Sequence, residues 1–421
     1  MRWLALLVLA ACGDNLAPSG SFEIVGHADL GARGMNSALA IAGDTAYVSS
    51  RIDNKPILIV DISHPDAPAV VGEIGAPNEA QPGMSSREMR VVPDQHLLVV
   101  LNLACSPDLH GCTGVRNAPE NLSFFDISDP RLPQFVGRYD FTAPLRGGRD
   151  PHEFFIDGGR AYVSVPGVGP QLEIVDVATR TKLLAWDPGL GNTGNDILHS
   201  VDVSRDGTVA YLSHQQGGLA LADLTQSPPV LLGAPLLWPG AAMGPHSAVP
   251  VDGRPLLVVT EEVYPAPYGA GCPWGHLRTV DISDPANTFV AGEYKLPEND
   301  AAMCASVPAH TAFTAHNATV THDLALVTWY AGGLQAIDIS DPAQPFQLAE
   351  LLPEPLAHVD VEDPGLGGNP IEMWSYPIID RGLIYVVDVR NGLYVLRYHG
   401  RWGEQVSSLR FREGNSNNTL E

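Results

Sequence analysis

Basic residues are scarce in this sequence. Among its 421 residues, Lys and Arg together number 24 against 48 Asp and Glu, which gives a formal net charge of −24 at pH 7. A nucleic-acid backbone or an anionic membrane surface is bound through a positively charged face. The composition therefore argues against both as partners of the folded chain, and it is compatible with cations as ligands.

Long apolar runs and common catalytic signatures are also missing. No segment after the N-terminus is apolar over the roughly 20 residues that a membrane-spanning helix needs. The sequence contains no Gly-x-Ser-x-Gly elbow, no His-Glu-x-x-His pair, no P-loop and no dinucleotide-binding fingerprint in a β-α-β setting. These absences argue against the enzyme classes that the motifs identify, and they leave open whether the protein is an enzyme.

The first twelve residues have the pattern of an export signal. Arg2 supplies a positive start, a short apolar run follows, and the tetrapeptide Leu9-Ala10-Ala11-Cys12 ends it. This tetrapeptide resembles the lipobox of bacterial lipoproteins, in which the cysteine receives the lipid and becomes the new N-terminus. The resemblance implies a signal peptide at residues 1–12 with Cys12 as the lipid anchor, followed by a tether at residues 13–20. In the alternative, an ordinary signal peptide, Cys12 has no role.

The same resemblance implies a location in the bacterial cell envelope, with the N-terminal lipid as the only contact with a membrane. Gly13 stands where an aspartate is associated with retention in the inner membrane. We therefore expect the outer membrane, either on its periplasmic side or at the cell surface.

Four further cysteines remain, and an exported compartment favours disulfides over free thiols. Cys105 and Cys112 are separated by six residues, which suggests the closure of a small local loop. Cys272 and Cys304 each lie in a long connection rich in Gly and Pro. We predict two disulfides, Cys105–Cys112 and Cys272–Cys304. A thiolate metal site is the alternative, although no Cys-x-x-Cys pair supports it.

One short unit recurs along the chain. Its apolar strand ends in Asp at six places and in Arg at a seventh, with successive copies 47 to 65 residues apart: Asp61, Asp126, Asp176, Asp223, Asp281, Asp338 and Arg397. An apolar strand precedes each copy, and in several copies a second strand that ends in Gly follows. Short strands rich in Val, Ile and Tyr indicate antiparallel sheet, and the period is near the length of one four-stranded propeller blade.

The copies Leu58-Ile59-Val60-Asp61 and Gln335-Ala336-Ile337-Asp338 resemble the LVIVD repeat, a bacterial repeat that forms propellers. The resemblance covers residues 21 to about 400, and it implies an all-β, seven-bladed β-propeller at residues 21–403. Asp and Ser of the recurring Asp-Ile-Ser-Asp-Pro segment can bond nearby backbone amides, so we interpret these aspartates as turn residues.

The two ends of the repeat array complement each other. The seventh copy stops near Gly400 without its outer strand, and Phe22-Glu23-Ile24-Val25-Gly26 matches the outer strand of the other copies. We expect the N-terminal strand to complete the last blade, because this removes two free sheet edges. Residues 404–421 are polar, and we predict a disordered tail there.

Alignment of the copies identifies one position at the start of each innermost strand. From the first copy to the seventh, this position holds Ser37, Glu88, His152, His199, His246, His316 and Ser375. Innermost strands line the channel of a propeller, so four histidines are expected to converge at one opening, with Glu88 beside them. Neutral imidazoles and a carboxylate suit a transition metal such as copper, iron or zinc.

The histidine pattern has a general resemblance to two propeller families. These are the carotenoid cleavage oxygenases, whose iron is held by four histidines, and the copper-dependent methanethiol oxidases of the selenium-binding-protein type. Fragments such as Pro151-His152-Glu153 and Pro245-His246-Ser247 are similar to the latter, without an extended match. Two alternatives need no metal: a duplicated structural histidine that bonds the backbone of the neighbouring blade, and recognition of protons or a small ligand.

Other residues at second-strand ends are predicted on the same face as a ligand surface: Arg51, His214, Glu261, Trp329 and Arg390. Glu262 follows Glu261, and only one of two adjacent strand residues can enter a shared site. Long insertions that carry the cysteines are predicted to wall this face. The sequence therefore favours a lipid-anchored binding or scaffold protein for an unnamed protein or small molecule. A metal-dependent oxidoreductase is the second hypothesis, and a purely structural role is the third.

Overall fold

The structure is a computed structural model that describes residues 19–75, 79, 81–113, 119–141, 151–166, 169–191, 197–238 and 243–418. The signal peptide, Cys12 and most of the tether lie outside the described residues. Regular structure in the described part is mostly antiparallel β-strand, with short helices such as α1 (Pro107–His110) and α2 (Gly403–Ser408). The predicted all-β class is confirmed. None of the described helices has the length and apolar character that crossing a bilayer requires.

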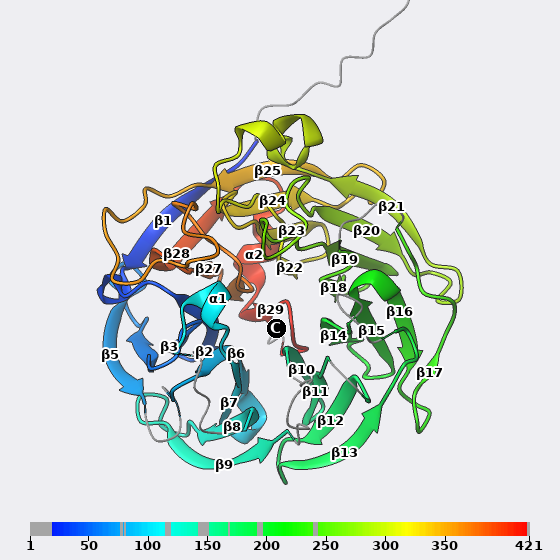
Figure 1. The fold of residues 1–421 in the computed structure, drawn as a ribbon, viewed down its shortest axis with the longest axis horizontal. Coiled ribbons are helices and arrows are strands. Elements are labelled where there is room, and N and C mark those ends of the chain that lie inside the picture. Colours follow the sequence, from blue (N-terminus) through cyan, green and yellow to red (C-terminus); the bar gives the residue numbers. More distant parts are fainter. Residues whose placement is uncertain are drawn as a thin grey trace, which may run out of the picture.

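The sheets radiate from a central axis, which is the β-propeller arrangement (Figure 1). Four sheets have four strands in chain order: β10 (Glu153–Asp157), β11 (Arg160–Ser164), β12 (Leu172–Asp176), β13 (Thr181–Trp186); β14 (Ser200–Val203), β15 (Val209–His214), β16 (Gly218–Asp223), β17 (Val230–Leu231); β18 (Ser247–Pro250), β19 (Leu256–Thr260), β20 (Leu277–Asp281), β21 (Phe289–Tyr294); β22 (Ala318–Val320), β23 (Leu324–Thr328), β24 (Leu334–Asp338), β25 (Phe346–Leu351). In each, the first strand lies nearest the axis and the last lies at the rim (Figure 1).

A further sheet has eight strands: β2 (Asn36–Ala42), β3 (Thr45–Ser50), β4 (Ile57–Asp61), β5 (Ala69–Ile74), β6 (Met84–Val92), β7 (Leu97–Ala104), β8 (Asn121–Asp126) and β9 (Gln134–Asp140). It consists of two four-stranded groups, β2–β5 and β6–β9, which the residue pair Ser50↔Ser86 connects. The last sheet has the order β1 (Ser21–Ala28), β28 (Gly392–His399), β27 (Leu383–Asp388), β26 (Ile378–Asp380) and β29 (Phe411–Glu413).

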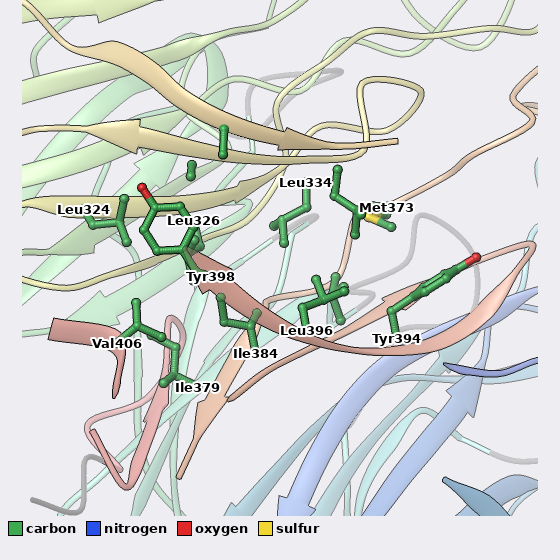
Figure 2. Packing of buried hydrophobic residues seen from close by; sticks show 14 of the residues in the cluster. Leu324, Leu326, Leu334, Met373, Ile379, Ile384, Tyr394, Leu396, Tyr398 and Val406 are labelled. Carbon is green, nitrogen blue, oxygen red and sulfur yellow. The ribbon is translucent and has the colours of Figure 1, made fainter. Parts of the chain in front are cut away.

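The core lies between adjacent blades. Figure 2 shows Leu326 and Leu334 of one blade packed against Ile384 and Leu396 of the next. All four side chains are fully buried, and burial of each such side chain contributes roughly 1.5–3 kcal/mol. Because the inner strands are covered on both faces, they read as continuous apolar runs, whereas the rim strand β5 leaves Val71 49% exposed.

The repeated aspartates are turn residues, as the sequence predicts. The Asp61 carboxylate accepts a hydrogen bond from the Ser63 amide at 2.9 Å, and Asp281 accepts from the Ser283 amide at 2.8 Å. These bonds turn the chain from the third strand toward the rim strand. These turns lie away from the axis. The most regular part of the repeat therefore shapes the blade, and the residues that line the channel can differ between copies.

The N-terminal strand closes the ring. β1 pairs antiparallel with β28 from Ser21↔His399 to Ala28↔Leu393, which confirms the predicted completion of the last blade. This pairing covers the outer edge of β28, and β1 becomes the rim strand of the last blade.

The prediction of a disordered tail at residues 404–421 is wrong for the described residues up to 418. α2 packs Val406 into the core, and β29 extends the last sheet by pairing with β26. Asn415 is fully buried, and its side-chain amide donates to Glu153 Oε1 at 2.5 Å. A segment rich in Asn, Ser and Gly resembles disordered chain in composition. Here its polar groups satisfy buried polar groups of the channel.

Candidate metal centre

Hydroxyl groups tie neighbouring blades together at the channel and mark equivalent positions. Each donates to the carbonyl of a residue at the start of the next innermost strand: Ser37 to Arg87 (3.0 Å), Ser164 to His199 (2.7 Å), Ser200 to His246 (2.6 Å), Ser247 to His316 (3.3 Å) and Thr328 to Trp374 (3.1 Å). His152 has the same local backbone pairing as His199. We call Arg87, His152, His199, His246, His316 and Trp374 the ring positions.

The ring positions correct the predicted alignment in three blades. Glu88 lies one residue after Arg87 and binds the Arg90 guanidinium at 3.1 Å, so it is not beside the histidines. Ser375 likewise lies one residue after Trp374, and Ser37 supplies a hydroxyl tie rather than a ring position. Because successive strand residues point to opposite sides, a shift of one residue moves a side chain out of the site.

The four histidines do converge. Ring centroids are 4.2 Å apart for His152 and His199, 4.1 Å for His199 and His246, and 4.0 Å for His246 and His316. The side chains of the last three are nearly enclosed, and His152 is half-buried. The strands β10, β14, β18 and β22 therefore deliver four imidazoles in a contiguous arc.

The carboxylate among these imidazoles comes from Glu262, which follows β19. Its oxygens lie 3.9 Å from His199 Nε2, 3.7 Å from His246 Nε2 and 3.2 Å from His316 Nε2. The ligand atoms of His199, His246 and Glu262 all fall within 4.8 Å of one another. The sequence predicts that only one of Glu261 and Glu262 can enter a shared site. In the structure, the carboxylate beside the histidines is that of Glu262.

Hydrogen bonds of the imidazoles follow the structural alternative only in part. That alternative requires each imidazole to bond a neighbouring backbone, yet within the described residues both nitrogens of His246 and Nδ1 of His199 have no hydrogen-bond partner. Seryl hydroxyls make the ties between blades instead. Two contacts do fit: His316 Nδ1 lies 2.6 Å from the Trp374 carbonyl, and His199 is hydrogen-bonded to the backbone of His246.

Burial favours the neutral forms of His152, His199 and His246, whereas the carboxylate of Glu262 stays ionised. Burial lowers the pKa of His199 to about 4 and holds the pKa values of His152 and His246 well below the usual value. Burial alone would raise the pKa of Glu262, but the nearby imidazoles, His316 foremost, outweigh it and hold this pKa well below its usual range. Neutral imidazoles and an ionised carboxylate are the forms that bind metals.

A chain of buried polar groups orients Glu262. The Tyr330 hydroxyl donates to Glu262 Oε1 and lies 3.3 Å from the Tyr264 hydroxyl, which accepts from the Arg51 guanidinium at 2.7 Å. Arg51 is held in turn by Asp363 at 3.5 Å. Such outer contacts fix the direction of a ligand and tune its basicity. Tyr330 could not be recognised from the sequence, because a Tyr near a strand end is equally typical of core packing.

The remaining residues of the predicted ligand face are structural. Glu261 accepts from the amides of Met243 and Gly244 and binds Arg278 at 3.1 Å. His214 and Trp329 are fully buried. Arg51 is also buried and acts through Tyr264, as described above, and Arg390 pairs with Glu362 outside the cluster. Second-strand ends reach this face, but most of their side chains hold the loops in place.

The insertions form a packed cap over the histidine face. Both predicted disulfides are present, Cys105–Cys112 and Cys272–Cys304. Trp274 is 5% exposed and packs with Trp374 and Tyr330 in one apolar cluster, so this insertion directs its indole inward. At the opposite end, the C-terminal segment reaches the axis (Figure 1), where the Asn415 carbonyl accepts from Arg90 at 3.0 Å.

Comparison with known families agrees with the repeat. The family model described as LVIVD repeat matches residues 33–74, 272–295 and 315–349. The chain carries LVIVD repeats. These matches fall on the first, fifth and sixth LVIVD copies, and the last of them includes His316. No curated protein matches the chain.

Solved structures match in fold. One is the β-propeller domain of Cps50 (Swd1) from Myceliophteria thermophila, with a TM-score of 0.54 and 10% sequence identity over 86% of this chain and 96% of that one. At this identity the similarity concerns the fold alone. The LVIVD copies therefore build a β-propeller, and the chemistry of the channel has to be argued from its own residues.

Proposed function

We propose that this protein is an exported, lipid-anchored, seven-bladed propeller that binds one transition-metal ion, copper, iron or zinc, at the channel. The ligands come from His199, His246, His316 and Glu262, with His152 at the open side of the cluster. This proposal makes the LVIVD propeller a binding protein whose ligand site is a metal centre.

The single observation that carries the proposal is the contact between His316 and Glu262. The Nδ1–H of His316 is engaged by the Trp374 carbonyl, so in the neutral ring Nε2 carries a lone pair. That lone pair faces a carboxylate oxygen at 3.2 Å. Two acceptors at this distance repel unless a proton or a metal ion lies between them. Donation of Nδ1–H to a backbone carbonyl is also the usual second contact of a metal-bound histidine.

The spacing of the donors supports a shared ion. Ligands with bonds of about 2.05 Å in a tetrahedron lie about 3.3 Å apart. The observed distances from Glu262 to the three Nε2 atoms are 3.2 to 3.9 Å. His199, His246 and Glu262 already lie within 4.8 Å of one another, and His316, which contacts Glu262 at 3.2 Å, has to move toward the other two imidazoles to complete a set of four donors. A set rich in imidazole suits copper, iron or zinc better than magnesium or calcium.

Other observations support the architecture and the compartment. The two halves of the eight-stranded sheet meet at one residue pair, so counting them as separate blades gives seven. Two disulfides fit an oxidising compartment, in agreement with the export signal. Lipid attachment at Cys12 is tested by mass spectrometry of the mature protein expressed in a bacterium, where a diacylglyceryl group on Cys12 supports it and an unmodified Cys12 rejects it.

An oxidoreductase is the second candidate function. It is favoured by the half-buried His152, which leaves one side of the otherwise enclosed cluster within reach of a small molecule. A reversible metal-centred potential, measured by voltammetry on the loaded protein, supports this candidate, whereas a loaded centre without redox activity leaves a binding role.

Metal analysis of tag-free protein tests the proposal. We expect about one equivalent of copper, iron or zinc by mass spectrometry after loading and dialysis, and loss of that metal in His246→Ala and His199→Ala. His276→Ala removes an imidazole of similar burial away from the cluster and should keep the metal. Circular dichroism confirms that each variant is folded. Folded wild-type protein without stoichiometric metal, or full occupancy in both cluster variants, rejects the proposal.

A further inference from the structure

Arg87 occupies a ring position beside the histidine cluster. Its carbonyl accepts the Ser37 hydroxyl in the same way that the His199 carbonyl accepts Ser164. The pairing of β6 with β7 shifts register between Ser86 and Glu88, so Arg87 is the bulged residue without a cross-strand partner. Bulges commonly re-aim a side chain at a site. The bulge here brings a cation to the position where four other blades place a histidine.

The guanidinium of Arg87 has no hydrogen bond or ion pair within the described residues, although the side chain is half-buried. The other enclosed arginines near the axis are matched by carboxylates. Arg90 binds Glu88 and Glu413, and Arg51 lies near Asp363 and Glu372. The Arg87 guanidinium therefore has N–H donors available at a partly buried site, where hydrogen bonds to an anion are strong.

Trp374 connects Arg87 to the cluster. The Arg87 guanidinium lies 5.7 Å from the centre of the Trp374 ring, and the His316 ring lies 5.1 Å from the same indole. The charge of Arg87 also contributes to the lowered pKa values of His152 and His199. Arg87 thus lies close enough to the cluster for its charge to act on both His152 and His199.

The charge of the loaded centre is positive. Two carboxyl groups lie near the imidazoles, Glu262 and Glu153, and the latter is 3.8 Å from His199 Nδ1. Burial raises the pKa of Glu153 to about 8, which favours its neutral form at pH 7. With Glu262 ionised, a divalent ion would keep a net charge of about +1, and Arg87 adds another. Because the site is partly enclosed, this excess is poorly screened by water. A small anion that bonds the metal and Arg87 together neutralises both.

We propose that Arg87 is an anion-binding residue and that the ligand or substrate of the metal centre is a small carboxylate or oxyanion. One oxygen of this anion binds the metal, and the other accepts hydrogen bonds from the guanidinium. The planar fork of arginine suits this two-oxygen geometry. The contact between the anion and the metal rests on the proposed metal site, whereas the contact between the anion and Arg87 does not.

Titration with acetate, and with neutral acetamide as the matched control, tests the proposal. Wild type, Arg87→Met and Arg87→Lys are loaded with one equivalent of Cu²⁺, and the shift of the copper absorption is followed. Acetate should bind the wild type, acetamide should not, and Arg87→Met should weaken acetate binding about 10- to 100-fold. Arg87→Lys should lie between them. Arg160→Met, which removes an arginine at the far turn of its blade, should match the wild type.

The outcomes separate this inference from the metal proposal. Equal acetate affinity in wild type and Arg87→Met, or no acetate binding by copper-loaded wild type, overturns the role of Arg87 and leaves the metal site standing. If the wild type retains no copper, the metal proposal fails, and calorimetric titration of acetate into the metal-free protein decides the role of Arg87. Binding that Arg87→Met abolishes supports it, and absence of binding overturns it.

Discussion

At the scale of residues, Glu262 and Glu261 show how adjacent carboxylates take different roles. Glu262 points among three imidazoles, whereas Glu261 binds Arg278 and two backbone amides. The alternation of side chains along an extended chain produces this division. The two residues therefore form a matched pair for mutagenesis, because each loses one buried negative charge.

We expect Glu262→Gln to lower metal affinity by at least about 100-fold, beyond the 10- to 100-fold typical of outer contacts. Glu261→Gln should lower stability by about 1–3 kcal/mol, because Arg278 loses its buried partner, while metal binding persists. Competition with a chromophoric chelator measures affinity, and urea unfolding measures stability. Equal metal affinity in the two variants would place the ligand elsewhere.

A second buried carboxylate sets a pH dependence of stability. Glu79 is 1% exposed and accepts hydrogen bonds from Ser86 and Asn102, and burial raises its pKa to about 7. The folded state then holds a proton that the unfolded chain releases from about pH 4.5 upward. The contribution of Glu79 to the free energy of unfolding should therefore fall by about 3 kcal/mol as pH rises from 4.5 to 7.

Glu79→Gln mimics the neutral form, so the variant should be more stable than the wild type at pH 8 and similar to it at pH 4.5. Urea unfolding at both pH values measures the difference in free energy of unfolding between the variant and the wild type. The contributions of all other titrating groups cancel in this difference. A difference that does not change with pH would show that Glu79 titrates normally.

Residue-level prediction succeeded where the repeat is regular. His152, His199, His246 and His316 could be located because each follows a similar inner-strand pattern. Arg87 was missed because the bulge in β6 shifts the register by one residue, and a bulge leaves no reliable mark in a single sequence. The sequence leaves Glu261 and Glu262 as alternatives, because it does not show which face a carboxylate takes after a strand.

At the scale of elements, the C-terminal segment closes the end of the channel opposite the cap. β29 pairs with β26, and Asn415 contacts both Glu153 and Arg90. Composition predicted disorder because no apolar periodicity marks this segment. The interactions that order it are polar and long-range, and they exist only once the ring has formed.

We expect Asn415→Ala to lower the free energy of unfolding by about 1–3 kcal/mol, because Glu153 and the channel lose a buried partner. Asn287→Ala removes an exposed bond to Asp284 and should change stability by less than about 0.5 kcal/mol. Urea unfolding of both variants is the measurement. Equal stabilities would mean that the C-terminal segment does not contribute to the fold through this contact.

At the scale of the whole molecule, stability depends on ring closure. Each blade packs on two neighbours, and the sheet that joins the ends is made of β1 and the last blade. The repeat predicted this closure from the missing outer strand of the seventh copy. Closure also brings the ring positions of different blades to one opening, which no single blade can do.

A chain that begins at Asp29 lacks β1 and should lose at least about 3 kcal/mol of stability, with aggregation through the exposed edge of β28. A chain that begins at Ser19 keeps every described element and is the control. Thermal unfolding and size-exclusion chromatography compare the two. A stable monomer without β1 would show that closure is dispensable.

The most direct test of the metal centre is anomalous diffraction from crystals of the protein loaded with Cu²⁺ or Zn²⁺, recorded on both sides of the absorption edge. The account predicts one strong peak about 2.0–2.2 Å from Nε2 of His199, His246 and His316 and from a carboxylate oxygen of Glu262. A peak elsewhere, or histidines that keep their positions with no anomalous signal between them, would contradict it.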